Sequence, residues 1–221
     1  MQFFKDLISK SRNVPLPQTR VLGIEGSPRK GGNSDVLLKQ MLKGVENVRK
    51  EHTEVHLRDL DFQGCLGCER CRKDKVCTRL MDGMSLIYPE ILNSRGLILV
   101  SPTHNYNVTA WVKAFIDRLY CFYDFDDNCP RGWSSRISGQ GRKAVIAAVC
   151  EQNNRKDMGF TLDAMRIPLE AHGFDIIDEL PVFKIFHKAK VKENQKVMDK
   201  ALELGERLGE ALTFPQGTSK K

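Results

Sequence analysis

The chain has 221 residues, of which 41% are hydrophobic, and its formal net charge is +7. This length supports one large domain with an apolar core, and no run of about 18 apolar residues suited to a membrane span occurs. The basic residues are interleaved with acidic ones and form no stripe with aromatic residues, so we expect neither a nucleic-acid-binding nor a membrane protein. Because no apolar secretion signal precedes the domain, we expect a cytoplasmic protein with mostly unpaired cysteines.

Short apolar runs alternate with longer segments of helical period, which is typical of a parallel sheet with crossover helices. Strands are predicted at residues 20–25, 53–60, 96–100, 144–149 and 174–180, and helices at residues 34–49, 84–93, 109–121, 157–172 and 193–212. Five such units predict a doubly wound, three-layer α/β sandwich, in which ligands bind at the carboxyl ends of the central strands. The loops after residues 25, 100 and 149 are therefore the expected site.

The chain divides into one predicted domain and two flanking segments. We expect residues 1–19 to be an N-terminal extension, residues 20–212 the α/β domain and residues 213–221 a tail. Residues 61–84 form a cysteine-rich insertion after the second predicted strand. Residues 122–142 are polar and contain several glycines, which is the composition of a lid or an intersubunit loop.

The loop Gly26-Ser-Pro-Arg-Lys-Gly-Gly-Asn-Ser34 joins the first predicted strand to the first predicted helix. Free backbone N–H groups and the positive end of a helix dipole make such a turn an anion site. Gly32 allows a close backbone approach, and side-chain donors come from Ser27, Arg29, Asn33 and Ser34. Neither a Walker loop nor Gly-x-Gly-x-x-Gly is present, so we expect a phosphate but no nucleoside triphosphate. The alternative is a polar turn that caps a helix.

Four of the seven cysteines lie within a short stretch, as Cys65, Cys68, Cys71 and Cys77. Disulfides are disfavoured by the expected compartment, and structural zinc usually takes two Cys-x2-Cys pairs separated by a longer segment. Three sulfurs at three-residue intervals suit three corners of an iron–sulfur cubane, with the fourth ligand just downstream. Gly64 and Gly67 leave N–H groups free to point at the sulfurs, and the net positive charge of the stretch favours an anionic cluster. The alternative is a set of free thiols. Packing or loop thiols are expected at Cys121, Cys129 and Cys150.

Two motifs resemble one known family. Gly26-Ser-Pro-Arg-x-x-Gly-Asn-Ser34 resembles the phosphate loop of the NADPH-dependent FMN reductase superfamily, and Ser101-Pro-Thr-His-Asn-Tyr106 with Trp111–Arg118 resembles its second flavin loop and following helix. The resemblance implies a flavodoxin-like, five-stranded parallel sheet of order 2-1-3-4-5 that binds the FMN phosphate at the first loop. It further implies flavin contacts from Pro102, Thr103, His104, Asn105 and Tyr106. No catalytic side chain is expected, since flavin chemistry does not require one. Structural ion pairing is expected for Asp117 and Arg118.

With compact cysteines after the second strand, the chain resembles the iron–sulfur flavoprotein branch of this superfamily. That resemblance implies FMN and one [4Fe–4S] cluster per subunit, in a homodimer or homotetramer. We expect a redox flavoprotein that passes electrons between a ferredoxin-like one-electron donor and a small acceptor. The first alternative is an NAD(P)H-dependent FMN or quinone reductase without a working cluster. The second, from another class, is a non-catalytic zinc-bound interaction module.

Overall fold

The computed structural model describes residues 14–212. Its elements in chain order are β1 (Gln18–Glu25), α2 (Asn33–Asn47), β2 (His52–His56), α3 (Cys71–Asp74), α4 (Met84–Asn93), β3 (Ser94–Pro102), α5 (Ala110–Arg118), β4 (Tyr123–Phe125), β5 (Trp133–Ser135), β6 (Arg142–Val149), α6 (Arg155–Met158), α7 (Thr161–Ala171), β7 (Phe174–Val182) and α8 (Gln195–Ala211). Short 3-10 helices cover Leu57–Asp59, Leu119–Phe122 and Lys190–Glu193. Most of the expected extension over residues 1–19 and all of the expected tail lie outside the described residues.

The central sheet is parallel, with the strand order β2-β1-β3-β6-β7. Numbered along the chain, these five strands have the order 2-1-3-4-5, so the predicted flavodoxin-like class is confirmed. β3 lies at the centre and is buried over nearly its whole length, as its continuous apolar run predicts for a strand covered on both faces.

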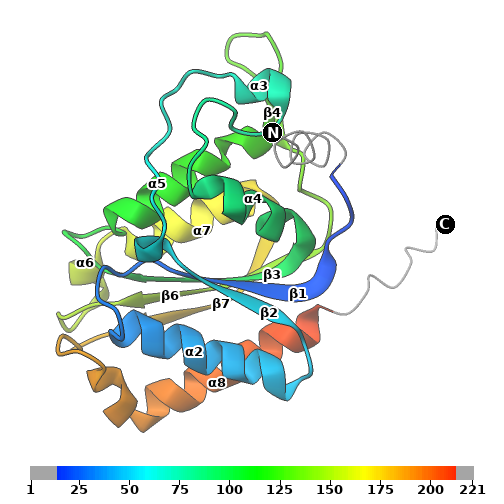
Figure 1. Ribbon diagram of the computed structural model, residues 1–221. Helices are drawn as coiled ribbons and strands as arrows, with labels where there is room; N and C mark the ends of the chain where they lie inside the picture. Colours follow the sequence, from blue (N-terminus) through cyan, green and yellow to red (C-terminus); the bar gives the residue numbers. More distant parts are fainter. Residues whose placement is uncertain (1–13, 213–221) are drawn as a thin grey trace.

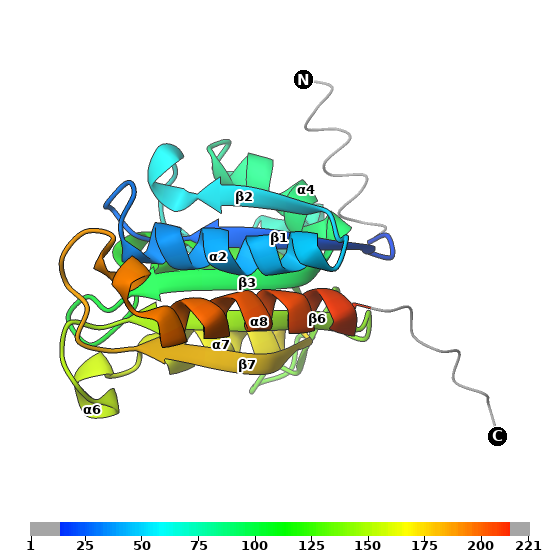
Figure 2. The same cartoon turned by 90° about the horizontal axis from the view of Figure 1, so that it is seen from below.

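Helices cover both faces of this sheet, which gives three layers (Figures 1 and 2). α2 and α8 lie on one face, and α4, α5 and α7 lie on the other. Leu204 of α8 belongs to the apolar core on the first side, and Phe115 of α5 belongs to the core on the second. α2 and α8 meet backbone to backbone, because a Cβ on Gly205 would lie 1.8 Å from the Met41 carbonyl oxygen. Within residues 14–212 no helix is both long and apolar enough to span a membrane.

Two predicted elements end or break earlier than expected. The second strand was predicted through residue 60, but β2 ends at His56 and residues 57–59 turn into a 3-10 helix. This turn buries Leu57 in the core and directs Arg58 toward Glu25 and Asp35, which flank the first loop. The helix predicted over residues 157–172 is interrupted at Gly159, whose φ is +59°, so that α6 and α7 are separate.

Residues 122–142, expected to be a lid or an intersubunit loop, contain an antiparallel hairpin of β4 and β5. The hairpin contacts the cysteine-rich insertion through ion pairs. Lys75 pairs with Asp124, and Arg131 lies 3.1 Å from Glu69. Opposite charges at these positions hold the hairpin against the segment that carries the cysteines.

Burial of His172 behind this hairpin predicts an acid-sensitive structure. The residue is 1% exposed, its Nδ1 lies 3.1 Å from the Ser135 hydroxyl, and its ring stacks on Tyr123. Burial, with Arg142 nearby, lowers its pKa from 6.5 to about 3. Its contribution to stability is therefore fully present above pH 6.5 and is lost as the pH falls toward 3. His172→Gln should reduce the loss of unfolding free energy between about pH 6.5 and 4.5 by about 2 kcal/mol. Denaturant titrations at both pH values measure this, and identical losses in the two proteins would contradict it.

Candidate functional site

The loops after β1, β3 and β6 meet at one edge of the sheet, as predicted. The register pairs Glu25 with Val100 and Val100 with Ala147, so these strands end at nearly the same level. Their loops line a pocket of about 140 Å³. Five of the predicted cofactor-binding residues line this pocket, namely Ser27, Arg29, Pro102, Thr103 and His104.

A fourth segment, after β7, also lines this pocket, and the sequence analysis did not identify it. Ile185 and Phe186 belong to it. The Arg29 guanidinium lies 4.8 Å from the Phe186 ring centroid, and its Nη1 donates to the Phe186 carbonyl oxygen at 3.3 Å. The pocket is smaller than the roughly 300–1,000 Å³ usual for small-molecule sites.

The first loop is a tight turn that leaves the N-terminus of α2 open. The Arg29 N–H donates to Ser27 Oγ at 3.0 Å, and the Gly32 N–H donates to the Arg29 carbonyl oxygen at 3.0 Å. Gly32 occupies the N-cap position and supplies no side-chain cap, while the Asp35 carboxylate in the first turn accepts from the Gly31 N–H. Ser34, in the first turn, is buried. An anion bound in the loop would complete the cap, since the first N–H groups of a helix have no partner within it.

Asn33 connects this loop to the segment after β7. Its Nδ2 donates to the His187 carbonyl oxygen at 3.0 Å, and its Oδ1 accepts from the Val191 N–H at 3.0 Å. The side chain was expected to be a donor to the phosphate. In the structure its amide holds the neighbouring segment, including the stretch next to Phe186, against the first loop.

A buried ion-pair network lies beneath the first loop. Glu25 accepts from the Ser27 N–H at 2.7 Å, and Arg58 pairs with Glu25 and, at 3.2 Å, with Asp35. His56 Nδ1 lies 2.9 Å from Asp35. The ligand atoms of Glu25, Asp35 and His56 lie within 4.8 Å of one another, but the Arg58 guanidinium already pairs with both carboxylates. We therefore interpret the network as support for the loop. Burial raises the pKa of Glu25 to about 7.

The second loop is a tight turn over residues 104–107. The His104 and Asn107 N–H groups donate to each other's carbonyl oxygens, at 2.8 and 3.0 Å. Asn105 and Tyr106 have positive φ values of 50° and 63°. Neither residue lines the pocket, and Tyr106 is 59% exposed. Burial, with Arg29 nearby, lowers the pKa of His104, which favours the neutral imidazole.

The start of α5 joins the second loop to the first. Thr109 is the N-cap of α5: its hydroxyl accepts from the Val112 N–H at 3.2 Å and donates to the Gly26 carbonyl oxygen at 2.7 Å. A Cβ on Gly26 would lie 2.0 Å from Val112 Cγ2, so only glycine fits against the helix here. This cap connects α5 directly to the candidate phosphate loop.

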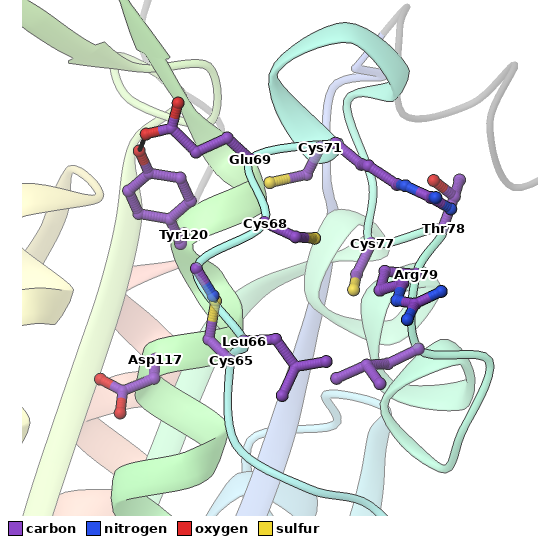
Figure 3. A pocket seen from close by; sticks show the side chains of 13 residues that line it. Cys65, Leu66, Cys68, Glu69, Cys71, Cys77, Thr78, Arg79, Asp117 and Tyr120 are labelled. Atoms are coloured by element: carbon purple, nitrogen blue, oxygen red, sulfur yellow. Dashed lines mark hydrogen bonds between the residues drawn. The ribbon is translucent and has the colours of Figure 1, made fainter.

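All four cysteines of the insertion line one pocket of about 420 Å³ (Figure 3). Cys65 and Cys68 are exposed, whereas Cys71 and Cys77 are half-buried. The Gly67 N–H donates to Cys65 Sγ at 3.4 Å, as expected for glycines beside the sulfurs, and its φ is +63°. The four side chains therefore surround one cavity, which a shared metal centre requires.

The sulfurs are more widely spaced than in a tetrahedral zinc site. At a Zn–S distance of about 2.3 Å, four sulfurs would lie about 3.8 Å apart. Within residues 14–212, no three of these cysteines bring their sulfurs within 4.8 Å of one another. Burial, with the three neighbouring cysteines, raises the pKa of the Cys71 thiol to about 11, so metal binding there must displace a proton. Among the described residues, the four cysteines therefore do not stand in the arrangement of a preformed tetrahedral zinc site.

The other residues singled out from the sequence have structural contacts. Asp117 pairs with Lys113 at 2.5 Å, and Arg118 pairs with Asp82 at 2.6 Å, so each belongs to an ion pair with a different partner. The three remaining cysteines lie where packing or loop thiols were expected. Cys121 and Cys150 are buried, and Cys129 is exposed.

The parallel sheet of this order, with ligand-type loops at its carboxyl edge, defines a flavodoxin-like protein. Solved structures with this fold include a flavone reductase, at a TM-score of 0.64 and 14% identity over 87% of this chain and 62% of that one. They also include an NAD(P)H:quinone oxidoreductase from Methanothermobacter marburgensis, at a TM-score of 0.63 and 14% identity over 86% of this chain and 100% of that one. At such identity the likeness concerns the fold alone.

The chain belongs to the NADPH-dependent FMN reductase family, whose model matches residues 19–156. It is 38% identical over 100 residues to an iron-sulfur flavoprotein from Archaeoglobus fulgidus, covering 45% of each chain. It is 31% identical over 99 residues to one from Methanocaldococcus jannaschii, covering 45% of this chain and 51% of that one. For one from Clostridioides difficile the identity is 33% over 100 residues, or 44% of each chain. The chain thus spans about half the length of these relatives, which support its place in the iron–sulfur flavoprotein branch.

Proposed function

We propose that this protein is an FMN-dependent oxidoreductase that carries a [4Fe–4S] cluster on Cys65, Cys68, Cys71 and Cys77. The observation that carries the proposal is the presence, in one domain, of an uncapped helix N-terminus at the sheet edge and a pocket lined by four cysteines. The family and the iron-sulfur flavoprotein relatives support this pairing of cofactors. When bound, FMN supplies one- and two-electron chemistry, and the cluster supplies one-electron exchange.

The first two loops provide the groups that FMN needs. The open start of α2, the hydroxyls of Ser27 and Ser34, and the Arg29 guanidinium are suited to the phosphate, and Gly32 allows a close approach. The flavin ring would find an apolar wall and polar edge contacts at Pro102, Thr103 and His104, with Asn105 and Tyr106 next along the same loop. These residues bind and orient the cofactor, and none is assigned an acid or base role.

We propose further that electrons enter from a ferredoxin-like carrier and leave to a small acceptor, in a homodimer or homotetramer. The cysteine pocket is open to solvent, since Cys65 and Cys68 are exposed. Arg70, Lys73 and Arg79, in the same stretch, are exposed and have no ion-pair partner among residues 14–212. A positive rim of this kind favours association with an acidic protein carrier.

The second candidate is an NAD(P)H-dependent FMN or quinone reductase with idle cysteines, and the family's description favours it. A zinc-bound interaction module receives no support from the sulfur spacing.

Rapid mixing separates the two redox candidates. Anaerobically prepared protein is mixed with a reduced ferredoxin or with NADPH, and the loss of flavin absorbance is followed. We expect fast reduction by the ferredoxin and slow reduction by NADPH. Fast reduction by NADPH in protein that contains no iron would establish the second candidate instead.

A further inference from the structure

Both ends of the cysteine segment are held by one buried side chain. Arg118, the last residue of α5, is 2% exposed. Its Nη1 donates to the Gln63 carbonyl oxygen at 2.9 Å, and its Nη2 donates to the Leu80 carbonyl oxygen at 3.4 Å. Gln63 stands just before Cys65, and Leu80 stands shortly after Cys77. One guanidinium therefore closes the segment that carries all four cysteines.

Every N–H group of Arg118 has an acceptor. Nη1 and Nη2 also donate to the two carboxylate oxygens of Asp82, at 2.6 and 2.9 Å, and Nε donates to the Tyr88 hydroxyl at 3.2 Å. These bonds and the two carbonyl bonds use all five donors of a guanidinium, whereas a lysine has only three. Asp82 also accepts from the Met84 N–H at 3.2 Å, at the start of α4. The segment is thereby fixed to two helices at once.

We propose that Arg118, together with Asp82, is the positioning residue of the cysteine pocket. It sets the distance between the two loop segments that carry Cys65 and Cys77 before any metal binds. This inference rests on the proposed cluster function, because the geometry it sets is that of the proposed ligands. Groups that fix metal ligands from outside commonly change metal affinity about 10- to 100-fold when removed.

The same helix also relates the cysteine pocket to the candidate flavin pocket. α5 has nine residues and is therefore about 14 Å long. Thr109 bonds its start to Gly26 of the first loop, and Arg118 bonds its end to the cysteine segment. Arg118 consequently fixes where the cysteines stand relative to the first loop, and not only relative to each other.

Arg142 offers a matched control. It is 0% exposed, and its Nη1 donates to the carbonyl oxygens of Ile91 and Ser94 at 2.6 Å each, at the end of α4. It is as buried as Arg118 and also bonds backbone carbonyls, but none of its bonds reaches residues 63–82. Arg142→Lys therefore reports the general cost of replacing a buried guanidinium.

The test compares Arg118→Lys, Asp82→Asn and Arg142→Lys in the full-length chain. In cluster-free protein, amide hydrogen exchange of residues 63–82 should be about tenfold faster in the first two variants and unchanged in Arg142→Lys. Asp82→Asn retains Arg118, so it decides the matter if Arg118→Lys does not fold. If residues 63–82 exchanged their amide hydrogens at the same rate in wild type and in Asp82→Asn, the positioning role of Arg118 and Asp82 would be overturned. Because this measurement needs no cluster, it stands even if the wild type binds no iron, a result that would reject only the proposed function.

Reconstitution at limiting iron then tests the link to the cluster. Arg118→Lys should hold about tenfold less iron and sulfide per FMN than wild type, with a changed electron paramagnetic resonance spectrum of the reduced centre. Arg142→Lys should match wild type in both content and spectrum. A wild-type spectrum and iron content in Arg118→Lys would overturn the positioning role.

Discussion

Cys68→Ala is expected to abolish iron and sulfide binding and to leave the FMN content unchanged. Cys68 is exposed and lines the cysteine pocket, so its removal takes away a proposed ligand without opening a cavity in the core (Figure 3). Loss of a ligand should lower metal affinity at least as much as loss of a supporting group, which is about 10- to 100-fold. The loops proposed to bind flavin lie at the other end of α5, so FMN binding should not depend on this thiol.

The matched control is Cys129→Ala. Cys129 is also exposed, but it lies in the turn of the hairpin and does not line the pocket. Iron, sulfide and FMN per chain are measured in wild type and both variants after anaerobic purification. Wild-type iron in Cys68→Ala, or an equal loss of iron in Cys129→Ala, would exclude the assignment of the four ligands.

Arg29→Ala is expected to weaken FMN binding about 10- to 100-fold, the range for removal of a charge-assisted hydrogen bond. Among residues 14–212, Arg29 is the one cation that lines the pocket at the sheet edge, and the start of α2 lies in the same loop. Its Nη1 donates to the Phe186 carbonyl oxygen, and a phosphate bound in this loop would offer the guanidinium a charged acceptor in its place.

Riboflavin, which lacks the phosphate, separates this effect from a change in the pocket wall. Fluorescence titration of the flavin-free protein should show a loss of FMN affinity in Arg29→Ala with little change for riboflavin. Lys30→Ala is the control, because Lys30 is an exposed neighbour that does not line the pocket. Equal losses for FMN and riboflavin would show that Arg29 acts on the ring pocket and not on the phosphate.

The sheet and the edge at which its loops meet could be predicted because they depend on local signals. The continuous apolar run of β3 marks a central strand, and parallel topology alone brings the loops after β1, β3 and β6 together. The common pocket of the four cysteines follows from their close spacing in the chain. These features require no knowledge of contacts between residues far apart in the sequence.

The supporting contacts could not be predicted, because they join distant parts of the chain. Arg118 binds Gln63 from 55 positions away, and Asn33 binds His187 from 154 positions away. No periodicity or motif in the sequence marks either pairing, since each depends on how several helices pack together. Phe186 was missed for the same reason: only the fold places the segment after β7 over the first loop.

The composition of anaerobically purified protein tests the central claim most directly. FMN, iron, acid-labile sulfide and zinc are measured per chain in the same sample. The proposed function predicts one FMN with about four iron and about four sulfide per chain, and no zinc. FMN without iron, or one zinc without sulfide, would contradict it.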